Sequence, residues 1–329
     1  MQKVYFYFTL LTFRIMQKVF VIILNFRGKE DTKECVLSVL ASSYVNYEIV
    51  IVDNYSKDDS SLYLKTTFPN IVLIETESNL GYAGGNNVGI RYAIEHGADS
   101  ILILNNDTIL DKDCITHFVS ESEMRKKSVL GGRVYYHDRP NLMQHFGGMW
   151  EKKKGKFRNV PDKNFNSDLP HNLDFVTGCA LFVPRKIFEE VGLFEESFFL
   201  YYEEIDWCLQ VRKKGFFCTY VPSPILWHKE SRSFTHPKPP QSYFQWRNRI
   251  YFIKRNFPKS EFYLWMLLHL PRRILLLIIK KYSNSLSSLF FGDSYKKRIS
   301  RLSYRASLKG IYDYFRGSFG PGPPWIFSP

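Results

Sequence analysis

The chain has 329 residues, of which 45% are hydrophobic and 17% aromatic, so it can bury a large core and is not an intrinsically disordered chain. Its net charge of +13 lies entirely in residues 241–329, where 16 Lys or Arg outnumber 3 Asp or Glu, while the first 240 residues balance to zero. A neutral body with a basic tail indicates an anionic partner; the long apolar runs between the charges favour a phospholipid surface over nucleic acid, which we do not expect to bind.

The N-terminus repeats itself, because Met-Gln-Lys-Val stands at residues 1–4 and again at residues 16–19. The stretch between the two copies has a short apolar run and no small-residue cleavage site, which is not the pattern of a signal peptide. We expect residues 1–15 to be an extension outside the folded domain, with Met16 as the start of that domain and a candidate initiator.

The five cysteines contain no C-x-x-C pair, as is typical of reduced thiols in the cytosol.

Strands and helices alternate through the first hundred residues. Continuous apolar runs predict buried strands at residues 19–24, 48–52, 71–74 and 100–104, and helical spacing of apolar residues predicts helices at 32–42 and 86–96. This alternation predicts an α/β fold with a mostly parallel, twisted, Rossmann-like sheet and helices on its faces.

The pattern after residue 130 is less regular. Residues 131–168 contain paired glycines and charges and indicate an irregular excursion over the surface. A strand at 175–183, an amphipathic helix at 203–214 and a closing strand at 216–221 follow. Pro222, Pro224, Pro237, Pro239 and Pro240 mark a shift to a linker. We therefore expect one domain of residues 16–235 and a basic, amphipathic helical region of residues 236–329.

Polar residues close the predicted strands. Asn25, Asp53 and the run Asn105-Asn106-Asp107 each follow an apolar run, and ligands of parallel sheets bind at the carboxyl ends of the strands. A carboxylate such as Asp107 can ligate Mg²⁺ or Mn²⁺ beside phosphate oxygens, although a polar turn after a strand has the same composition.

A glycine-rich stretch lies between these strand ends, with the sequence Asn79-Leu80-Gly81-Tyr82-Ala83-Gly84-Gly85-Asn86-Asn87. Glycines let the backbone approach a ligand closely, and the N-terminus of the helix that follows attracts anions. The alternative is a glycine-rich loop with asparagine caps and no ligand.

Three acids, Glu203, Glu204 and Asp206, stand at the start of a predicted helix. Neighbouring carboxylates can raise one another's pKa, so that one of them serves as a general base. The alternative is simple pairing of negative charge with the helix dipole.

His228 follows the closing strand, where a lone histidine has either a ligand role or a structural one.

In their order and spacing these segments resemble glycosyltransferase family 2, which has the GT-A fold. The matching stretches are VFVIILNFRGKEDTKECVLSVLASSYVNYEIVIVDNYSKD, NLGYAGGNNVGI, ILILNNDTIL and TGCALFVPRKIFEEVGLFEESFFLYYEEIDWCLQVRKKGF, and the resemblance extends from Lys18 to Asn256. The branch that looks most similar contains bacterial rhamnosyltransferase-type enzymes of surface polysaccharide assembly. The late segment KGIYDYFRG also resembles the C-terminal end of that branch.

The resemblance implies roles for individual positions. Asp53 would hold the pyrimidine base of a sugar nucleotide. Asp107, the last acid of a D-x-D-like motif, would bind the metal together with His228, while Asn105 replaces the first acid and so weakens the metal affinity. Glu204 corresponds to the general base of an E-D pair; the pair is Glu-Glu here, so Asp206 and Glu203 stay candidates. The residues implied to line the nucleotide site are Asn25, Asp53, Asn79, Gly81, Asn86, Asn87 and Asn105.

The implied reaction is an inverting transfer of a sugar from a nucleoside-diphosphate sugar, dTDP-rhamnose among the candidates, to a hydroxyl of a lipid-linked or polysaccharide acceptor, with Mg²⁺ or Mn²⁺ as cofactor. Two other classes stay open. A sugar nucleotidylyltransferase would carry a loop rich in Gly with Arg directly after the first strand, where this chain has Asn25-Phe26-Arg27-Gly28-Lys29. A non-catalytic membrane scaffold of the same fold would more readily have lost Asp107 or the acids at 203–206.

The tail contains two apolar runs, residues 262–270 and 274–279, separated by Pro271-Arg272-Arg273. Neither run alone reaches the roughly 18–20 residues that span a bilayer, and two arginines at the centre of a single span are costly. We expect an interfacial helical hairpin in the headgroup layer, at the cytoplasmic face of a bacterial inner membrane. A buried packing helix is the alternative.

Overall fold

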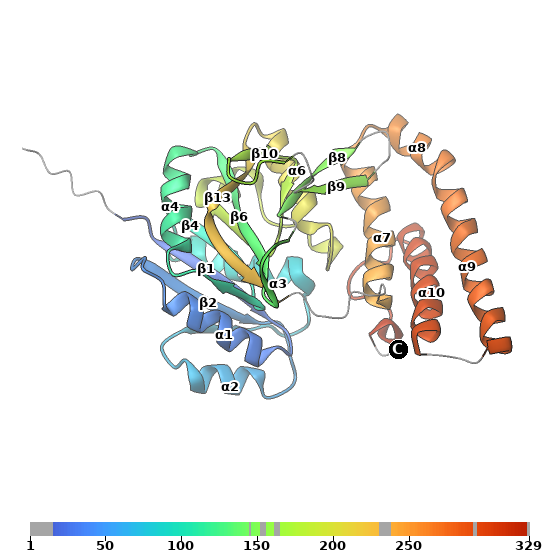
Figure 1. The fold of residues 1–329 in the computed structure, drawn as a ribbon, viewed down its shortest axis with the longest axis horizontal. Helices are drawn as coiled ribbons and strands as arrows, with labels where there is room; N and C mark the ends of the chain where they lie inside the picture. Colours follow the sequence, from blue (N-terminus) through green and yellow to red (C-terminus); the bar gives the residue numbers. More distant parts are fainter. Residues whose placement is uncertain are drawn as a thin grey trace, which may run out of the picture.

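The computed structural model describes residues 16–144, 146–151, 156–160, 165–229, 238–291 and 295–327. The expectation for residues 1–15 and the expected domain boundary at residue 235 lie outside these described residues. The chain folds into an α/β body with a group of C-terminal helices beside it, as Figure 1 shows.

A mixed sheet forms the centre of the body, with the strand order β10-β13-β6-β12-β4-β1-β2-β3 and with β5 and β7 at its margins. The section from β4 to β3 is parallel, and β12 runs antiparallel between β4 and β6. This confirms the expected α/β class and its parallel strands. The parallel strands are β1 (Val19–Asn25), β2 (Tyr47–Asp53), β3 (Val72–Glu75) and β4 (Ser100–Asn105), and the antiparallel strand β12 spans Ala180–Pro184.

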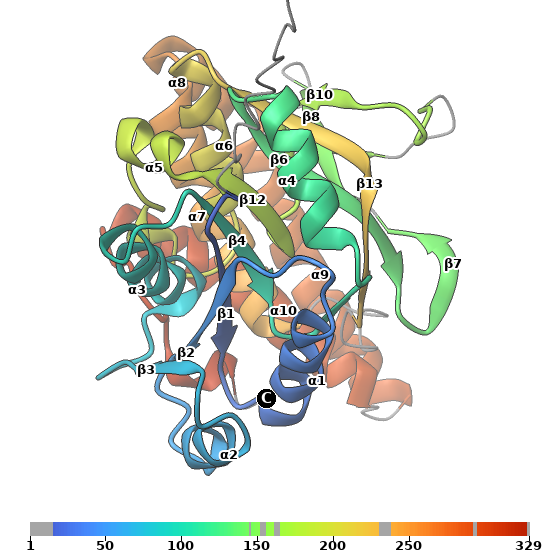
Figure 2. The ribbon, with the colours of Figure 1, turned by 90° about the vertical axis from the view of Figure 1, so that its left-hand side faces the viewer.

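Helices cover both faces of the sheet. Figure 2 shows α1 (Lys29–Leu40) and α4 (Cys114–Met124) on one face, and α3 (Gly81–Glu95), α5 (Arg185–Val191) and α6 (Glu203–Lys213) on the other. The helix α2 (Ser60–Thr67) lies beside α1 at the β3 edge. The α3 helix packs closely because its glycines face the sheet: a Cβ at Gly89 would lie 2.5 Å from Cγ2 of Ile22. It begins at Gly81, five residues before the predicted start, so the glycine-rich stretch is helical.

The expected surface excursion at residues 131–168 is wrong. The strand β6 (Ser128–Tyr136) runs through the central sheet, and its paired glycines are buried. A Cβ at Gly131 would lie 2.7 Å from Cβ of Val176, and one at Gly132 would lie 2.8 Å from the carbonyl oxygen of Pro224. The glycines therefore reflect close packing on both faces, which local periodicity does not reveal.

Three further strands follow β6. The strand β7 (Arg139–Met143) pairs with β6, whereas β8 (Gly147–Glu151) and β9 (Lys156–Val160) form a small separate sheet with β11 (Phe175–Val176). The predicted strand at 175–183 is therefore two strands, β11 and β12, which belong to different sheets. This small sheet brings Trp150 and Phe157 toward the C-terminal helices.

The closing strand is longer than expected. The strand β13 (Phe217–His228) continues through both prolines that were predicted to open a linker. Its pairing with β6 shifts register between Tyr220 and Ile225, and a proline is tolerated in a strand where the ladder is interrupted in this way. The C-terminal part of β13 pairs with β5 (Thr108–Leu110), and its N-terminal part pairs with β10 (His171–Leu173).

The described part of the C-terminal region contains the helices α7 (Pro239–Asn256), α8 (Lys259–Leu268), α9 (Leu270–Phe291) and α10 (Tyr295–Phe315). Helices α7 and α10 lie side by side, and α9 runs along the outer edge of the molecule (Figure 1). Phe252 of α7 packs on Trp150 and Phe157 of the small sheet, with ring centroids 5.7 and 5.5 Å apart. The C-terminal helices are thus joined to the body through an aromatic core.

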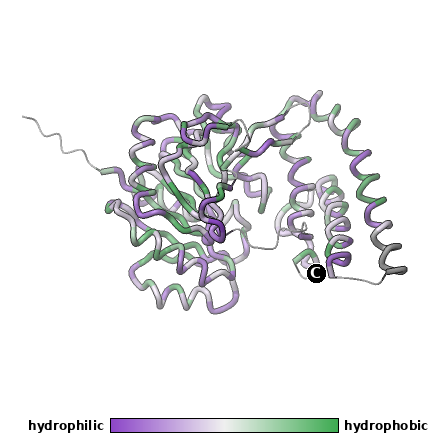
Figure 3. The backbone as a smooth tube through the Cα atoms, in the orientation of Figure 1, coloured by the Kyte–Doolittle hydropathy of each residue, from purple (hydrophilic) through white to green (hydrophobic). Residues whose placement is uncertain are grey.

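The expected hairpin between the two apolar runs is wrong. Only His269 separates α8 from α9, and the Arg273 amide donates to the His269 carbonyl across the junction. Pro271 stands in the first turn of α9, where its missing N–H interrupts no helical hydrogen bond. Within the described residues, one helical stretch, Lys259–Ser283, is long and apolar enough to cross a membrane by length and composition alone. An 18-residue window of this stretch has a mean hydropathy of 1.6 and is 17% buried. Figure 3 shows its apolar segments along the outer edge.

Gly310 sets the distance between α7 and α10. A Cβ at this position would lie 2.3 Å from the carbonyl oxygen of Tyr243, which is a backbone atom that cannot rotate away. Gly310→Ala would gain up to about 1 kcal/mol of helix propensity, but we expect the clash to dominate and to lower the free energy of unfolding by about 1–3 kcal/mol. Chemical denaturation measures the change. The exposed Phe315→Ala on the same helix should change it by no more than about 0.5 kcal/mol; equal effects would contradict the packing argument.

Candidate active site at the carboxyl ends of the strands

Asn25 and Asp53 lie side by side at the ends of β1 and β2, as expected for strand ends of a parallel sheet. The Asn25 amide donates to Oδ2 of Asp53 over 2.7 Å, and both side chains are buried. Ser56 adds its hydroxyl to the same oxygen at 2.7 Å and its backbone N–H to Oδ1 at 2.9 Å. The orientation of the Asp53 carboxylate is therefore set by the protein itself.

A second network joins the end of β2 to the start of α3. The Asn54 amide donates to Oδ1 of Asn79 at 3.1 Å and to the carbonyl of Gly81 at 2.9 Å. Asn79 in turn accepts from the Gly81 amide at 2.8 Å. Sequence analysis named Asn79 and Gly81 but missed Asn54, although it directly follows Asp53.

Gly81 occupies a position that only glycine fits. Its φ is +70°, and a Cβ there would lie 2.2 Å from the carbonyl oxygen of Phe199. This close approach joins the start of α3 to the turn that precedes α6.

Asn86 and Asn87 are buried inside α3. Asn86 donates to the carbonyl of Tyr82 at 2.9 Å, while its Oδ1 has no hydrogen-bond partner among the described residues. Asn87 makes a two-way contact with the backbone of Phe194, donating at 2.9 Å and accepting at 3.0 Å, and it also donates to Glu196. Asn87 therefore holds the segment before α6, and a role at the nucleotide stays a prediction for both residues.

Asp107 and His228 come together although 121 positions separate them in the chain. The pairing of β5 with β13 places Thr108 opposite His228, and Nε2 of His228 lies 3.1 Å from Oδ1 of Asp107. The other ring nitrogen, Nδ1, lies 3.1 Å from Oε1 of Gln144. Gln144, which sequence analysis missed, thus orients the imidazole so that Nε2 faces the carboxylate.

These groups fit a divalent cation that arrives with an oxygen-rich substrate. A carboxylate and an oriented imidazole are suitable ligands for Mn²⁺ or Mg²⁺, and an outer hydrogen bond like that of Gln144 is typical of metal-binding histidines. Among the described residues no group of three or more His, Cys, Asp or Glu side chains could hold a metal. Further ligands would have to come from amide or phosphate oxygens or water. Asn105 ends β4 within the same segment, and its carbonyl accepts from Thr108 at 2.6 Å.

Glu203 and Glu204 begin α6 in a buried setting. One carboxylate oxygen of each is shielded from solvent and has no hydrogen-bond partner among the described residues. Burial raises the pKa of Glu203 well above its ordinary range, and repulsion from Glu204 adds to this; burial also raises the pKa of Glu204. Asp206 differs, because Arg255 and Asn256 bind both its oxygens.

Residues 178 and 179 lie close to Glu204 and to the end of β4, the strand that precedes Asp107. A Cβ at Gly178 would lie 3.2 Å from Cγ of Glu204 and 3.3 Å from the Tyr82 hydroxyl, which donates to the Gly178 carbonyl. The Asn105 amide, two residues before Asp107, donates to the carbonyl of Cys179. Burial raises the pKa of the Cys179 thiol to about 12, and the charges of both Asp107 and Glu204 contribute. The strand-end acid and the acidic helix start therefore flank one segment.

The turn before α6 is strained. Phe199, Tyr201 and Tyr202 have φ values of 64°, 67° and 78°, a region that costs a non-glycine residue about 1–2 kcal/mol. Such clusters persist only where surrounding contacts enforce them, and they are common at functional sites. The strain here places Glu203 and Glu204 immediately after the turn.

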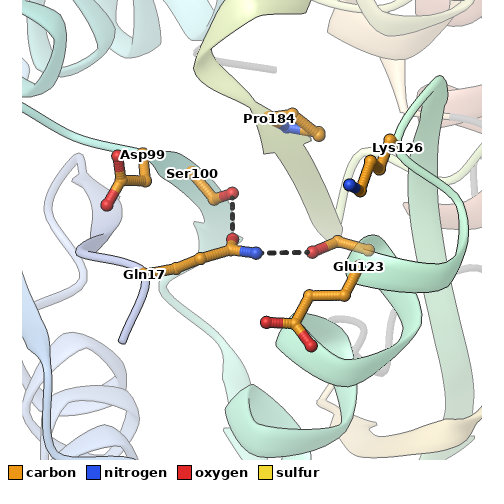
Figure 4. Close-up of a pocket in the computed structure, with 7 residues that line it drawn as sticks. Gln17, Asp99, Ser100, Glu123, Lys126 and Pro184 are labelled. Carbon is orange, nitrogen blue, oxygen red and sulfur yellow. Dashed lines mark hydrogen bonds between the residues drawn. The ribbon is translucent and has the colours of Figure 1, made fainter. Parts of the chain in front are cut away.

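A cavity of about 340 Å³ lies elsewhere, at the amino end of β4 (Figure 4). Ser100, the first residue of β4, lines it, whereas Asn105 at the other end of that strand belongs to the candidate site. None of the predicted site residues lines this cavity, whose walls are formed by Gln17, Asp99, Ser100, Ser122, Glu123, Lys126 and Pro184.

Comparison with known proteins gives one family and several relatives. The family model described as "Glycosyl transferase family 2" matches residues 20–192. The "Low-salt glycan biosynthesis hexosyltransferase Agl10" of Haloferax volcanii is 30% identical over 59% of this chain, and the match spans 62% of that relative's length. "Rhamnosyltransferase WbbL" of Escherichia coli is 26% identical over 66% of this chain and 86% of its own. The solved structure of GalNAc-T7 with UDP, GalNAc and Mn²⁺ superposes with a TM-score of 0.55 at 15% identity, covering 78% of this chain and 57% of the other.

The buried position of Glu203 generates a prediction about pH. Because its pKa is raised in the folded protein, stability falls as pH rises from the ordinary value of 4.5 through the raised folded value. Glu203→Gln cannot ionise, so we expect it to be more stable than the parent protein at about pH 8 and equally stable at about pH 4.5. Unfolding free energies at both pH values measure this. Glu75→Gln, at an exposed position, is the control. A Glu203→Gln protein that is less stable than the parent protein at both pH values would contradict a raised pKa of Glu203.

Proposed function

The chain belongs to glycosyl transferase family 2 and has the GT-A fold, and from this premise we propose that it is an inverting glycosyltransferase acting on a nucleoside-diphosphate sugar. The observation that carries the proposal is that the Asp107–His228 pair and Glu204 flank the same segment, residues 178 and 179. The Asp107–His228 pair suits the diphosphate of the donor, and Glu204 suits a hydroxyl of the acceptor.

The nucleotide would lie along the ends of β1 and β2. Asp53, held by Asn25 and Ser56, would accept hydrogen bonds from the pyrimidine base without having to reorient. Asn79 and the Phe199 carbonyl accept from the first N–H groups of α3, so Asn79 and Gly81 would line the nucleotide site by fixing the backbone at this helix start. The buried Oδ1 of Asn86 has no hydrogen-bond partner among the described residues. Of the two helix asparagines, Asn86 is therefore the one with an acceptor left to bind the donor.

Asp107 and His228 would hold Mg²⁺ or Mn²⁺, with Asn105 able to add its amide oxygen. When bound, the cation would offset the charge that develops on the leaving diphosphate. The protein's own contribution is the fixed geometry of the pair, because Gln144 holds the imidazole toward Asp107.

Glu204 would accept the proton of the acceptor hydroxyl as that oxygen attacks the anomeric carbon. Its buried, unpartnered oxygen and raised pKa suit a general base. Asp206 is the weaker candidate because Arg255 and Asn256 occupy its carboxylate. Glu203, next to Glu204, would act by charge repulsion, which raises the affinity of the pair for the proton taken from the acceptor.

The name of the Escherichia coli relative supports rhamnose as the transferred sugar, and we propose dTDP-rhamnose, the donor that the family resemblance implies. We propose a lipid-linked or polysaccharide acceptor in cell-surface glycan synthesis, since the name of the Haloferax volcanii relative also refers to glycan biosynthesis.

Glu204→Gln is expected to lower the transfer rate about 10²–10⁴-fold, because it removes the general base and keeps the shape of the side chain. Donor affinity should change little. Transfer from dTDP-rhamnose and a panel of UDP-sugars, with Mn²⁺ and membranes as acceptor source, gives the rate, and calorimetry gives the affinity. Asp206→Asn is the comparison, and a Glu204→Gln protein with undiminished turnover would remove Glu204 from this role.

The outer face of α8 and α9 supports attachment to an anionic membrane at its cytoplasmic side. Leu267 is 74% exposed and Leu264 57% exposed, and Arg272, Arg273 and Lys280 are exposed beside them. Each basic residue near an anionic surface adds about 1 kcal/mol. The exposed large apolar side chains of this face are Tyr263, Leu264, Leu267, Leu268, Leu275, Leu276, Ile278, Ile279 and Tyr282.

Replacing Leu264, Leu267, Leu275 and Leu276 together by serine should abolish binding to vesicles that contain anionic lipid, because it removes the apolar part of the contact. High salt should release the unaltered protein, because it screens the charges. Co-sedimentation measures both, with the exposed Leu62→Ser on α2 as control. Resistance of the membrane-bound protein to salt and to alkaline extraction would instead show that Lys259–Ser283 spans the bilayer.

A further inference from the structure

Two polar side chains of α7, Arg247 and Asn248, are completely buried. The Arg247 guanidinium donates to three backbone carbonyls: Gly320 at 2.6 Å, Phe198 at 2.9 Å and Ser197 at 3.3 Å. A buried charge is retained only where its hydrogen bonds are satisfied. Here the satisfying groups belong to the strained turn and to the C-terminal tail.

Asn248 acts on the same turn. Its amide nitrogen lies 2.8 Å from each of three carbonyl oxygens, those of Phe198, Leu200 and Tyr201. Its own oxygen accepts from Nε of Arg247 at 2.9 Å, so the two side chains form one unit. Together they collect carbonyls that the left-handed residues of the turn direct toward α7.

The opposite side of the turn is held by α3. The Tyr82 amide donates to the Phe199 carbonyl at 2.6 Å, directly beside Gly81. The turn ends where the Asp206 amide bonds to the Tyr202 carbonyl in the first turn of α6. Residues 197–202 are thus held between the start of α3 and the middle of α7, and Glu203 and Glu204 follow with no intervening residue.

We propose that Arg247 and Asn248 are positioning residues that hold the turn of residues 197–202, in which Phe199, Tyr201 and Tyr202 have positive φ, and thereby place Glu204 for proton transfer. This inference rests on the proposed function of Glu204 and extends it. Neither side chain contacts Glu204 itself in the described hydrogen-bond network; each acts through the backbone of the turn. The basic C-terminal region therefore has a role in catalysis in addition to membrane attachment.

Asn248→Ala and Arg247→Lys test the proposal. Misplacement of a catalytic group by about 1 Å costs on the order of 10²-fold in rate, so we expect Asn248→Ala to lower kcat by about that factor while the donor KM changes less than about twofold. The pH dependence of kcat should move, because the surroundings of Glu204 change. Arg247→Lys keeps the charge and should retain more activity than Arg247→Ala. Lys254→Gln, at an exposed position of the same helix, is the matched control.

Hydrogen exchange of the peptide that covers residues 197–206 gives a readout independent of activity. Faster exchange in Asn248→Ala and Arg247→Lys, with the exchange of β1 and β4 unchanged, is the expected result. Unaltered kcat, pH profile and exchange in both variants would overturn the proposal, as would an equal loss of kcat and donor affinity together with exchange that rises throughout the protein. If Asn248→Ala does not fold, Arg247→Lys provides the same comparison.

Loss of sugar transfer and loss of the positioning role are distinguishable. If the unaltered protein binds no sugar nucleotide and transfers no sugar, the proposed function fails, while the exchange experiment still reports whether α7 holds the turn. If the unaltered protein is active and the α7 variants match Lys254→Gln, only the positioning role fails.

Discussion

The structure depends on two adjacent carboxyl groups at the start of one helix, the buried Glu203 and the half-buried Glu204, each with one oxygen shielded from solvent. Desolvation and mutual repulsion oppose their ionisation, so the chain must hold this helix start firmly against relaxation toward solvent. It does so with a turn that has three left-handed non-glycine residues. Contacts from α3 on one side and α7 on the other stabilise that turn. Helix α3 and the C-terminal helices thereby act on the same few backbone atoms.

The parts of the site that sequence predicts are those that follow from local rules. Asn25 and Asp53 could be paired because apolar runs locate the strands, and parallel strands end at one edge of a sheet. The acids at 203–206 stand out because three carboxylates in four residues at a helix start is a local pattern. The approach of His228 to Asp107 was reached through family resemblance, since nothing in local spacing brings positions 107 and 228 together.

The parts that sequence misses depend on tertiary contacts. Gly131 and Gly132 look like turn residues, yet they lie in a buried strand because Val176 and Pro224 approach them closely. Gln144, Asn54 and Arg247 carry no motif, and each gains its role only from a partner distant in sequence or outside its own element. Pro271 looked like a break between two helices, but a proline in the first turn of a helix does not interrupt it.

The hydrogen bond from Arg247 to Gly320 has a consequence for biosynthesis. On the ribosome the strands β1 to β4 emerge early, and their parallel pairing needs nothing from the last part of the chain. The guanidinium, by contrast, obtains its full set of acceptors only after residue 320 has been translated and has left the exit tunnel. A nascent chain can therefore pair these strands before its acidic helix start is secured, because Arg247 still lacks the Gly320 carbonyl.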